Sequence, residues 1–256
     1  MTIFRTLVLF LFVCFQAMDL LAQNNASTVY TNRSFQPFVN SVQLYPVSNA
    51  FNQELRAPIV AIDQTETLLL QFDLLMEEYI DVQAKIIHCN ADWTESVYSD
   101  IEFLYDYNTF DLRDFEYSIN TKTLYVNYWM NMPRVKKSGN YIIQVYQNGD
   151  EDDVLFTRRF IAYENKVSVN LDTRISNGVA NRRINQQVEF DLIYRQLRVS
   201  NPMMDFSVTV RQNQRWDTAI DDLKPTSVRG DGATLEYRHF GMENNFKAGN
   251  EFRWID

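Results

Sequence analysis

The sequence predicts an all-β protein made of two or more tandem antiparallel β-sandwich domains of the immunoglobulin-like type. Three observations support this fold class. Apolar and polar residues alternate with a period of two in many segments, which is typical of half-buried strands. No long amphipathic helical pattern interrupts them. The chain has 256 residues, 46% hydrophobic and 14% aromatic, which is enough apolar material for one large domain or two small ones.

The first 22 residues have the features of a secretory signal peptide. Arg5 supplies a positive charge, residues 7–15 form an apolar run, and Ala22 ends a stretch suited to cleavage. This apolar run is much shorter than the roughly 20 residues that a membrane-spanning helix requires. We therefore expect cleavage after Ala22 and export of the mature chain.

The strands follow in order along the mature chain. Alternation is clearest in residues 80–86, where Ile80, Val82, Ala84 and Ile86 are separated by polar residues. Residues 96–112 are irregular and predict a structured connection. The remaining predicted strands cover residues 41–45, 59–62, 68–72, 124–130, 141–146, 154–161, 167–171, 188–194 and 206–210.

A polar break at residues 164–166 divides the predicted strands into two groups. We expect an N-terminal extension over residues 23–37, a first β-sandwich domain over residues 38–164, and a second, incomplete β-domain over residues 165–256. Within the first domain, Tyr141 follows a turn and resembles the tyrosine of an immunoglobulin-like strand F, whose hydroxyl bonds back to the preceding corner. An ordinary buried tyrosine after a tight turn is the alternative.

Cysteine usage excludes a disulfide-stabilised scaffold. Cys14 lies in the predicted signal peptide, so Cys89 is the single cysteine of the mature chain. One thiol cannot form an intramolecular disulfide. We expect Cys89 to be a small buried hydrophobic residue.

Charge and motif content argue against nucleic-acid binding and against catalysis. The formal net charge is -9, which disfavours a phosphate-binding surface. The two histidines, His88 and His239, show none of the usual metal or nucleophile spacings. We expect no catalytic residue, no cofactor and no metal, and we interpret the acidic run at residues 150–153 as a solvated hairpin tip rather than a calcium site. A carboxylate pair for glycoside hydrolysis has no identifying spacing and stays open.

Several strings resemble segments of the type IX secretion system plug proteins of Bacteroidetes, in the same order. Residues 87–93, Ile-His-Cys-Asn-Ala-Asp-Trp, resemble the H-C-[DN]-A-[DN]-W segment of that family. Further matches are S-G-N-Y at residues 138–141, F-x-R-R-F at 156–160, Q-N-x-R-W-D at 212–217, L-x-P at 223–225 and G-N-E-F-R at 249–253. The motif residues are His88, Cys89, Asp92, Trp93, Ser138, Gly139, Asn140, Tyr141, Arg158, Arg159, Phe160, Gln212, Asn213, Arg215, Trp216, Asp217, Asn250, Glu251, Phe252 and Arg253.

We interpret these motif residues as structural. Trp93 and Trp216 are expected in cores, Gly139 at a positive φ, and Arg158, Arg159, Arg215 and Arg253 in ion pairs with acids such as Asp92, Asp217 or Glu251. Family members continue beyond the G-N-E-F-R segment, so we expect this chain to be the N-terminal part of a longer protein.

The resemblance implies a non-enzymatic function. Plug proteins are periplasmic and close the periplasmic mouth of the large outer-membrane translocon barrel, so that barrel is the implied partner. The alternative is a secreted β-sandwich module that binds a glycan or another ligand through exposed aromatic residues such as Trp93, Trp129 or Trp216.

Overall fold

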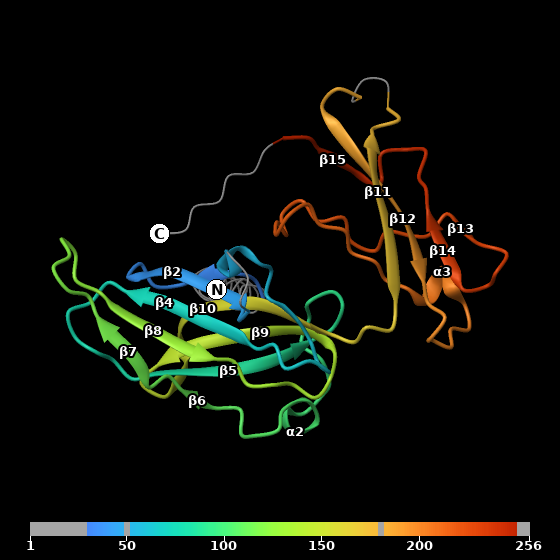
Figure 1. The fold of residues 1–256 in the computed structure, drawn as a ribbon. Coiled ribbons are helices and arrows are strands. Elements are labelled where there is room, and N and C mark those ends of the chain that lie inside the picture. Colours follow the sequence, from blue (N-terminus) through green and yellow to red (C-terminus); the bar gives the residue numbers. More distant parts are fainter. Residues whose placement is uncertain (1–29, 49–51, 179–181, 250–256) are drawn as a thin grey trace, which may run out of the picture. The chain divides into compact units, whose positions relative to one another are not determined.

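The computed structural model describes residues 30–48, 52–178 and 182–249 (Figure 1). Contacts divide the chain into two compact units, with the division between Tyr163 and Glu164. The predicted signal peptide lies outside the described residues. Within the described ranges, no helix is long and apolar enough to cross a membrane.

The first unit contains two sheets, as expected for a sandwich. Residues of both sheets contribute to one apolar cluster. The six-stranded sheet has the order β1-β10-β9-β5-β6, with β3 pairing β10, and the four-stranded sheet has the order β2-β4-β8-β7. The strands of the six-stranded sheet are β1 (Arg33–Ser34), β3 (Ile59–Ala61), β5 (Val82–Cys89), β6 (Phe110–Asp111), β9 (Gly139–Gln147) and β10 (Asp150–Tyr163). Those of the four-stranded sheet are β2 (Val39–Pro46), β4 (Leu68–Leu74), β7 (Asp114–Tyr117) and β8 (Val126–Asn131).

Alternation of side chains builds this core. In β4, every second residue from Leu68 to Leu74 is buried and the residues between them are half-buried. Phe72 stacks on Tyr128 of β8 and meets Phe156 of the other sheet edge-on, with ring centroids 5.4 Å and 4.8 Å apart. Aromatic contacts of this kind add to the free energy gained by burying the rings. Phe72 therefore joins the two sheets.

The second unit contains one five-stranded sheet in the described residues. Its order is β11-β12-β14-β13, with β15 also pairing β12. Phe190, Leu192, Leu235 and Tyr237 share an apolar cluster on one face of this sheet. The strands are β11 (Ser168–Ile175), β12 (Asn185–Ile193), β13 (Ser227–Val228), β14 (Thr234–Tyr237) and β15 (Asn245–Lys247).

Most predicted strands are confirmed, and one is wrong. Residues 206–210 form no strand; they follow the short helix α3 (Pro202–Asp205), and Val210 makes a single bridge to Ile220. The alternating residues Phe206, Val208 and Val210 instead cover the apolar cluster of the second unit from a loop. Their alternating pattern reflects burial of every second side chain against the cluster, which tertiary packing can produce without a neighbouring strand.

The connections also differ in detail from the expectations. β3 pairs β10 in parallel, so the first unit is not wholly antiparallel. Residues 96–112 are the irregular connection that the sequence predicts, and they contain the short helix α2 (Asp100–Phe103) and strand β6. Three further short helical residues, η1 (Gln53–Leu55), follow β2. The expected hairpin is present, since Gln147 pairs Asp150 across Asn148 and Gly149, which both have positive φ. The acidic residues 150–153, expected at its tip, instead begin strand β10.

Substitution of Phe72 by Ala tests the inter-sheet contact. We expect the free energy of unfolding to fall by about 3–5 kcal/mol, because a large, fully buried ring is replaced by a cavity. Phe240 is 94% exposed, so Phe240→Ala is the matched control and should change stability by less than about 0.5 kcal/mol. Urea unfolding followed by circular dichroism measures both, and equal effects would contradict this account of the core.

Candidate functional site

The sequence motifs of the first unit meet at one end of the six-stranded sheet. His88 and Cys89 end β5, and the register of β5 and β9 places them opposite Tyr141 and Asn140. Phe160 of β10 lies opposite Tyr141 on the other side. Motifs far apart in the sequence therefore form one cluster, which we call the motif cluster.

Aromatic rings pack on the inner side of the motif cluster. The His88 imidazole meets Tyr141 edge-on with ring centroids 4.8 Å apart, and Tyr141 stacks on Phe160 at 5.0 Å. His88 Nδ1 lies 2.8 Å from Ser96 Oγ. Burial lowers the pKa of His88 below its ordinary value, because a buried imidazolium loses its hydration. His88 thus packs as one of the rings of this cluster, and its burial disfavours the charged form.

The Tyr141 hydroxyl closes a tyrosine corner. It donates a 2.7 Å hydrogen bond to the Lys137 carbonyl, four residues earlier in the chain. The ring is fully buried, and burial raises the pKa of Tyr141. The bond predicted for strand F of an immunoglobulin-like domain is therefore confirmed.

Gly139 is required for a different reason from the one expected. Its φ is not in the positive range occupied by Gly149 and Gly232. A Cβ at residue 139 would instead lie 2.5 Å from His88 Nε2. The expectation of a positive φ was wrong, because the glycine supplies space for the neighbouring imidazole rather than backbone freedom.

The outer side of the motif cluster is organised by Trp93 and Arg159. The Arg159 guanidinium lies 4.1 Å from the Trp93 ring centroid, a favourable cation–π geometry, and its Nε donates to the Tyr30 carbonyl at 2.8 Å. Asn140 donates to the carbonyls of Asn90 and Ala91 at 3.0 Å and 3.3 Å. Trp93 is buried, as expected, and has a φ of 67°, which is unfavourable for a bulky residue.

Cys89 is a buried thiol beside this outer side. Burial, with a smaller contribution from Glu95, raises the pKa of Cys89 to about 12. A thiol of that pKa is protonated and poorly nucleophilic at neutral pH. The structure thus agrees with the interpretation of Cys89 as a buried hydrophobic residue.

The expected arginine pairs are correct in part. Arg215 and Asp217 form a bidentate pair, with N–O distances of 3.1 Å and 2.5 Å. Asp92 instead accepts hydrogen bonds from the Thr94 amide and hydroxyl. Among the described residues Arg158 makes no ion pair; it donates to the Thr157 carbonyl at 2.8 Å, and burial lowers its pKa to about 10.

The motif of the second unit lies outside that unit's apolar cluster. Trp216 is half-buried, with the Arg211 guanidinium 4.0 Å from its ring centroid, so the expectation of a core position was wrong. Gln212 donates to the Lys247 carbonyl at 3.0 Å, and Asn213 has a positive φ. Asn250, Glu251, Phe252 and Arg253 lie outside the described residues.

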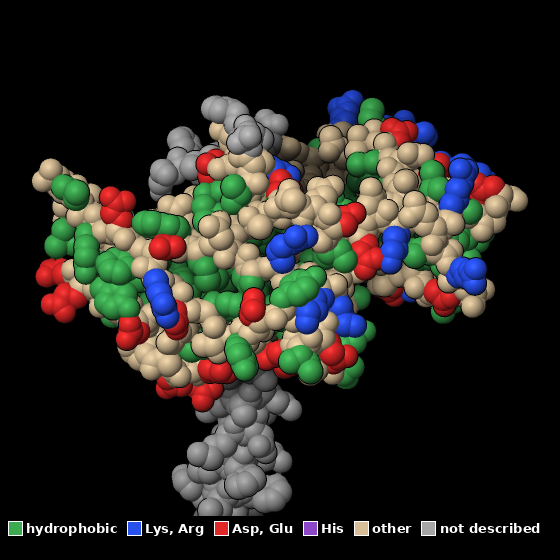
Figure 2. All heavy atoms as spheres, turned by 60° about the horizontal axis from the view of Figure 1, so that its bottom comes forward, with side chains coloured by type: hydrophobic (Ala, Val, Ile, Leu, Met, Phe, Trp, Pro, Cys, Tyr) green, Lys and Arg blue, Asp and Glu red, His purple; other side chains and the backbone are tan. Residues whose placement is uncertain are grey.

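A groove of about 950 Å³ runs beside the motif cluster and was not predicted from the sequence. Its lining is rich in carboxylates and in aromatic rings. Figure 2 shows acidic and hydrophobic side chains interspersed on the face of the first unit that is in view. Lys85, also in the lining, pairs with Glu151. The carboxylates and aromatic residues of the lining are Glu95, Asp100, Glu151, Asp152, Asp153, Tyr30, Phe35, Tyr98, Phe103 and Tyr107.

The net charge of the protein is concentrated in the first unit. Residues 23–163 contain 10 Lys and Arg against 19 Asp and Glu, whereas residues 164–256 contain 13 of each. The first unit therefore carries a net charge of -9 and the second unit none. A surface of that kind attracts basic partners and repels acidic ones.

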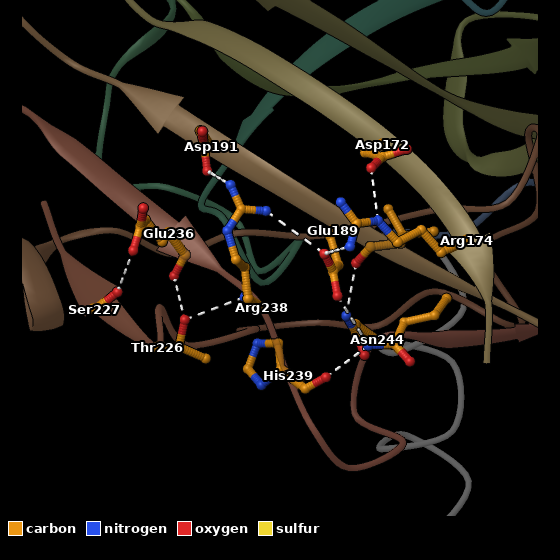
Figure 3. A network of polar contacts seen from close by, with 12 residues as sticks. Asp172, Arg174, Glu189, Asp191, Thr226, Ser227, Glu236, Arg238, His239 and Asn244 are labelled. Carbon is orange, nitrogen blue, oxygen red and sulfur yellow. Dashed lines mark hydrogen bonds and ion pairs between the residues drawn. The ribbon is translucent and has the colours of Figure 1, made fainter. Parts of the chain in front are cut away.

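A network of ion pairs covers the polar face of the five-stranded sheet in the second unit (Figure 3). Arg238 lies between two carboxylates, 2.6 Å from Asp191 and 3.6 Å from Glu189. Arg229 joins Asp191 to Glu236 at 2.8 Å and 2.9 Å. Arg174 of β11 reaches Glu189 at 3.4 Å. Because Glu189 is almost fully buried, these arginines are needed to balance its charge.

No cluster of three or more potential metal-ligating His, Cys, Asp or Glu side chains occurs in the described part of the chain. The side chains gathered in the motif cluster act on one another through packing and hydrogen bonds. The features that face outward are the acidic groove of the first unit, the network of ion pairs of the second unit and the strand edges.

Comparison with known proteins supports the resemblance seen in the sequence. The family described as "Type 9 secretion system plug protein 1st domain" matches residues 39–164. No curated protein matches the chain. A crystal structure of a hypothetical protein from Parabacteroides merdae is similar, with 29% identity and a TM-score of 0.79. The similarity covers 87% of this chain and 55% of that protein, so this chain spans about half its length.

Substitution of Gly139 by Ala tests the contact with His88. We expect a loss of about 1–3 kcal/mol in the free energy of unfolding, because the new Cβ overlaps the imidazole. Gly230 has no atom within 4 Å of an added Cβ, so Gly230→Ala is the matched control. In a His88→Ala background the cost of Gly139→Ala should decrease, and an unchanged cost would show that the two residues are not coupled.

The pH dependence of stability tests the environment of His88. Burial lowers its pKa in the folded protein, so the unfolded chain takes up a proton on His88 at higher pH than the folded protein does. This contribution to stability is complete above the unfolded pKa and is lost as the pH falls below it. We expect the free energy of unfolding to drop more between about pH 7.5 and about pH 5.5 in the wild type than in His88→Asn. Equal drops would contradict a depressed pKa.

Proposed function

We propose, from the membership of residues 39–164 in the type 9 secretion system plug family, that this chain is a non-enzymatic periplasmic plug subunit. In this proposal, the chain binds the periplasmic mouth of the outer-membrane translocon barrel and seals it. The family match carries the proposal. The predicted signal peptide, with cleavage after Ala22, would supply export to the periplasm.

The environment of the motif residues supports a structural role for them. His88, Cys89 and Tyr141 are buried, and Arg159 and Asn140 hold neighbouring segments through backbone carbonyls. We propose that these residues keep the first unit rigid and that other surface residues contact the partner. A rigid protein loses little conformational entropy on binding, which favours a stable seal.

The charge of the first unit supports recognition of a basic surface. Its net charge of -9 and its acidic groove would be complementary to lysine and arginine residues around the translocon mouth. Such an interaction should weaken as the salt concentration rises.

One observation favours the alternative of a glycan- or ligand-binding module. Tyr98 and Tyr107 line the groove, and Tyr107 is 93% exposed. Exposed aromatic rings beside carboxylates can stack on a sugar and accept hydrogen bonds from its hydroxyls. This function would place the ligand in the groove of the first unit.

An affinity pull-down tests the plug proposal. The tagged mature chain is incubated with detergent-solubilised outer membrane from its own host, and bound proteins are identified by mass spectrometry. We expect a large barrel protein in near-stoichiometric amount, released by an excess of the untagged chain. No barrel recovered from membranes shown to contain it would contradict the proposal.

Sealing is tested separately from binding. A strain lacking the gene should become permeable to a large antibiotic that intact outer membranes exclude, and expression of the wild-type chain should restore the barrier. Normal permeability together with a positive pull-down would retain binding and exclude sealing. Sugar binding that is lost in Tyr107→Ala, with an empty pull-down, would establish the alternative.

A further inference from the structure

Strand β11 is an exposed edge of the five-stranded sheet in the second unit. All eight of its residues are exposed, including Val169, Leu171 and Ile175 at 55%, 63% and 67%. β11 pairs β12 on one side, and no described residue pairs with its other side. The backbone groups along that side are therefore available to another strand.

The two faces of β11 differ in chemistry. Val169 and Leu171 lie opposite Leu192 and Phe190, so they extend the face that carries the apolar cluster. Asp172 and Arg174 lie on the other face, where Arg174 contacts both Asp172, at 2.7 Å, and Glu189, at 3.4 Å. A strand added to this edge would need apolar residues on one face and charges on the other.

β11 has few of the usual devices that prevent edge pairing, although Asp172 and Arg174 place charges on its polar face. Its sequence, Ser-Val-Asn-Leu-Asp-Thr-Arg-Ile, contains no proline and no lysine. Its ladder with β12 shows no register shift, and hence no bulge. Edges that are not used for pairing are commonly interrupted by such features.

We propose that β11 pairs antiparallel with β11 of a second copy of this chain, with Thr173 on the twofold axis. In this register Leu171 lies opposite Ile175 on the apolar face. Asp172 lies opposite Arg174 on the polar face, so each of these pairs occurs twice. Two five-stranded sheets then become one continuous sheet.

Charge complementarity selects this register among those that keep the faces matched. Centring the pair on residue 172 would place Asp172 opposite its own copy, and like charges directly opposite each other are unfavourable. Centring it on residue 171 would leave Ile175 without an apolar partner on β11 and place Arg174 opposite Ser168. With Thr173 at the centre, Asp172 faces Arg174 and Leu171 faces Ile175, and each of these pairs occurs twice. Val169 then lies opposite Asn177, beyond the end of the strand.

The dimer is expected to be weak, because a single strand pair covers little area compared with the roughly 1,200–2,000 Å² of stable interfaces. It does not depend on the plug function, since the strand edge and its residues belong to the second unit alone. A failed dimerisation test would leave the plug proposal unchanged.

Cysteine cross-linking tests the register. Residue 173 would lie directly opposite its copy, within the Cα separation that a disulfide accepts, whereas the two copies of residue 171 would be roughly 14 Å apart along the strands. With copper-phenanthroline as oxidant, the mature Thr173→Cys protein should form a covalent dimer on a non-reducing gel. The Leu171→Cys protein should form much less. Cys89 is buried, so the wild type serves as the background control.

Analytical ultracentrifugation tests the dimer in solution. The wild-type mature chain should show a concentration-dependent monomer–dimer equilibrium. Thr173→Lys, which places two like charges on the axis, should raise the dissociation constant at least ~10-fold. Thr123 is exposed in a loop of the first unit, so Thr123→Lys is the matched control and should leave the equilibrium unchanged. Melting curves confirm that each variant is folded.

Three results would overturn the proposal. They are a wild-type chain that stays monomeric up to the highest soluble concentration, equal cross-linking at residues 171 and 173, and a dimer unaffected by Thr173→Lys. The first result would mean that the β11 edge pairs with a strand of another protein or faces solvent. The second would show that pairing has no fixed register.

Discussion

The close approach of the His88 imidazole to the Cα of Gly139 is the constraint on which the first unit depends. It lets the ends of β5 and β9 lie side by side with a large ring between them. The same placement sets Tyr141 against His88 and Phe160, from where its hydroxyl reaches the Lys137 carbonyl. On the outer side, the turn after β5 places Trp93 under Arg159. One missing side chain thus permits contacts among three strands.

The two units are stabilised in different ways. The first unit buries apolar side chains between two sheets, so the hydrophobic effect acts on both inner faces. The second unit has an apolar cluster on one face of its sheet and an ion-pair network on the other. Ion pairs of this kind contribute little net stability. Arg238 and Arg229 both reach Asp191 of β12, so these pairs link neighbouring segments of the sheet.

The outward features of the two units suit different kinds of partner. The acidic groove of the first unit acts through long-range charge, which is sensitive to salt and favours basic surfaces. The β11 edge of the second unit acts through backbone hydrogen bonds and alternating side chains, which require close contact with an extended strand.

The sequence by itself determined the fold class and most strands, and it placed a tyrosine after a turn at residue 141, which the structure shows to form a tyrosine corner. These depend on local patterns: a period of two, a turn followed by Tyr141, and the Asn148-Gly149 hairpin. The tertiary structure decided the remaining features, because those features depend on which residues, distant in the sequence, become neighbours. The reason for Gly139 is a ring from another strand, Trp216 lies under Arg211 rather than in the core, and residues 206–210 alternate without pairing. The groove is likewise formed by segments that only the fold brings together, since burial and proximity are properties of the packed chain.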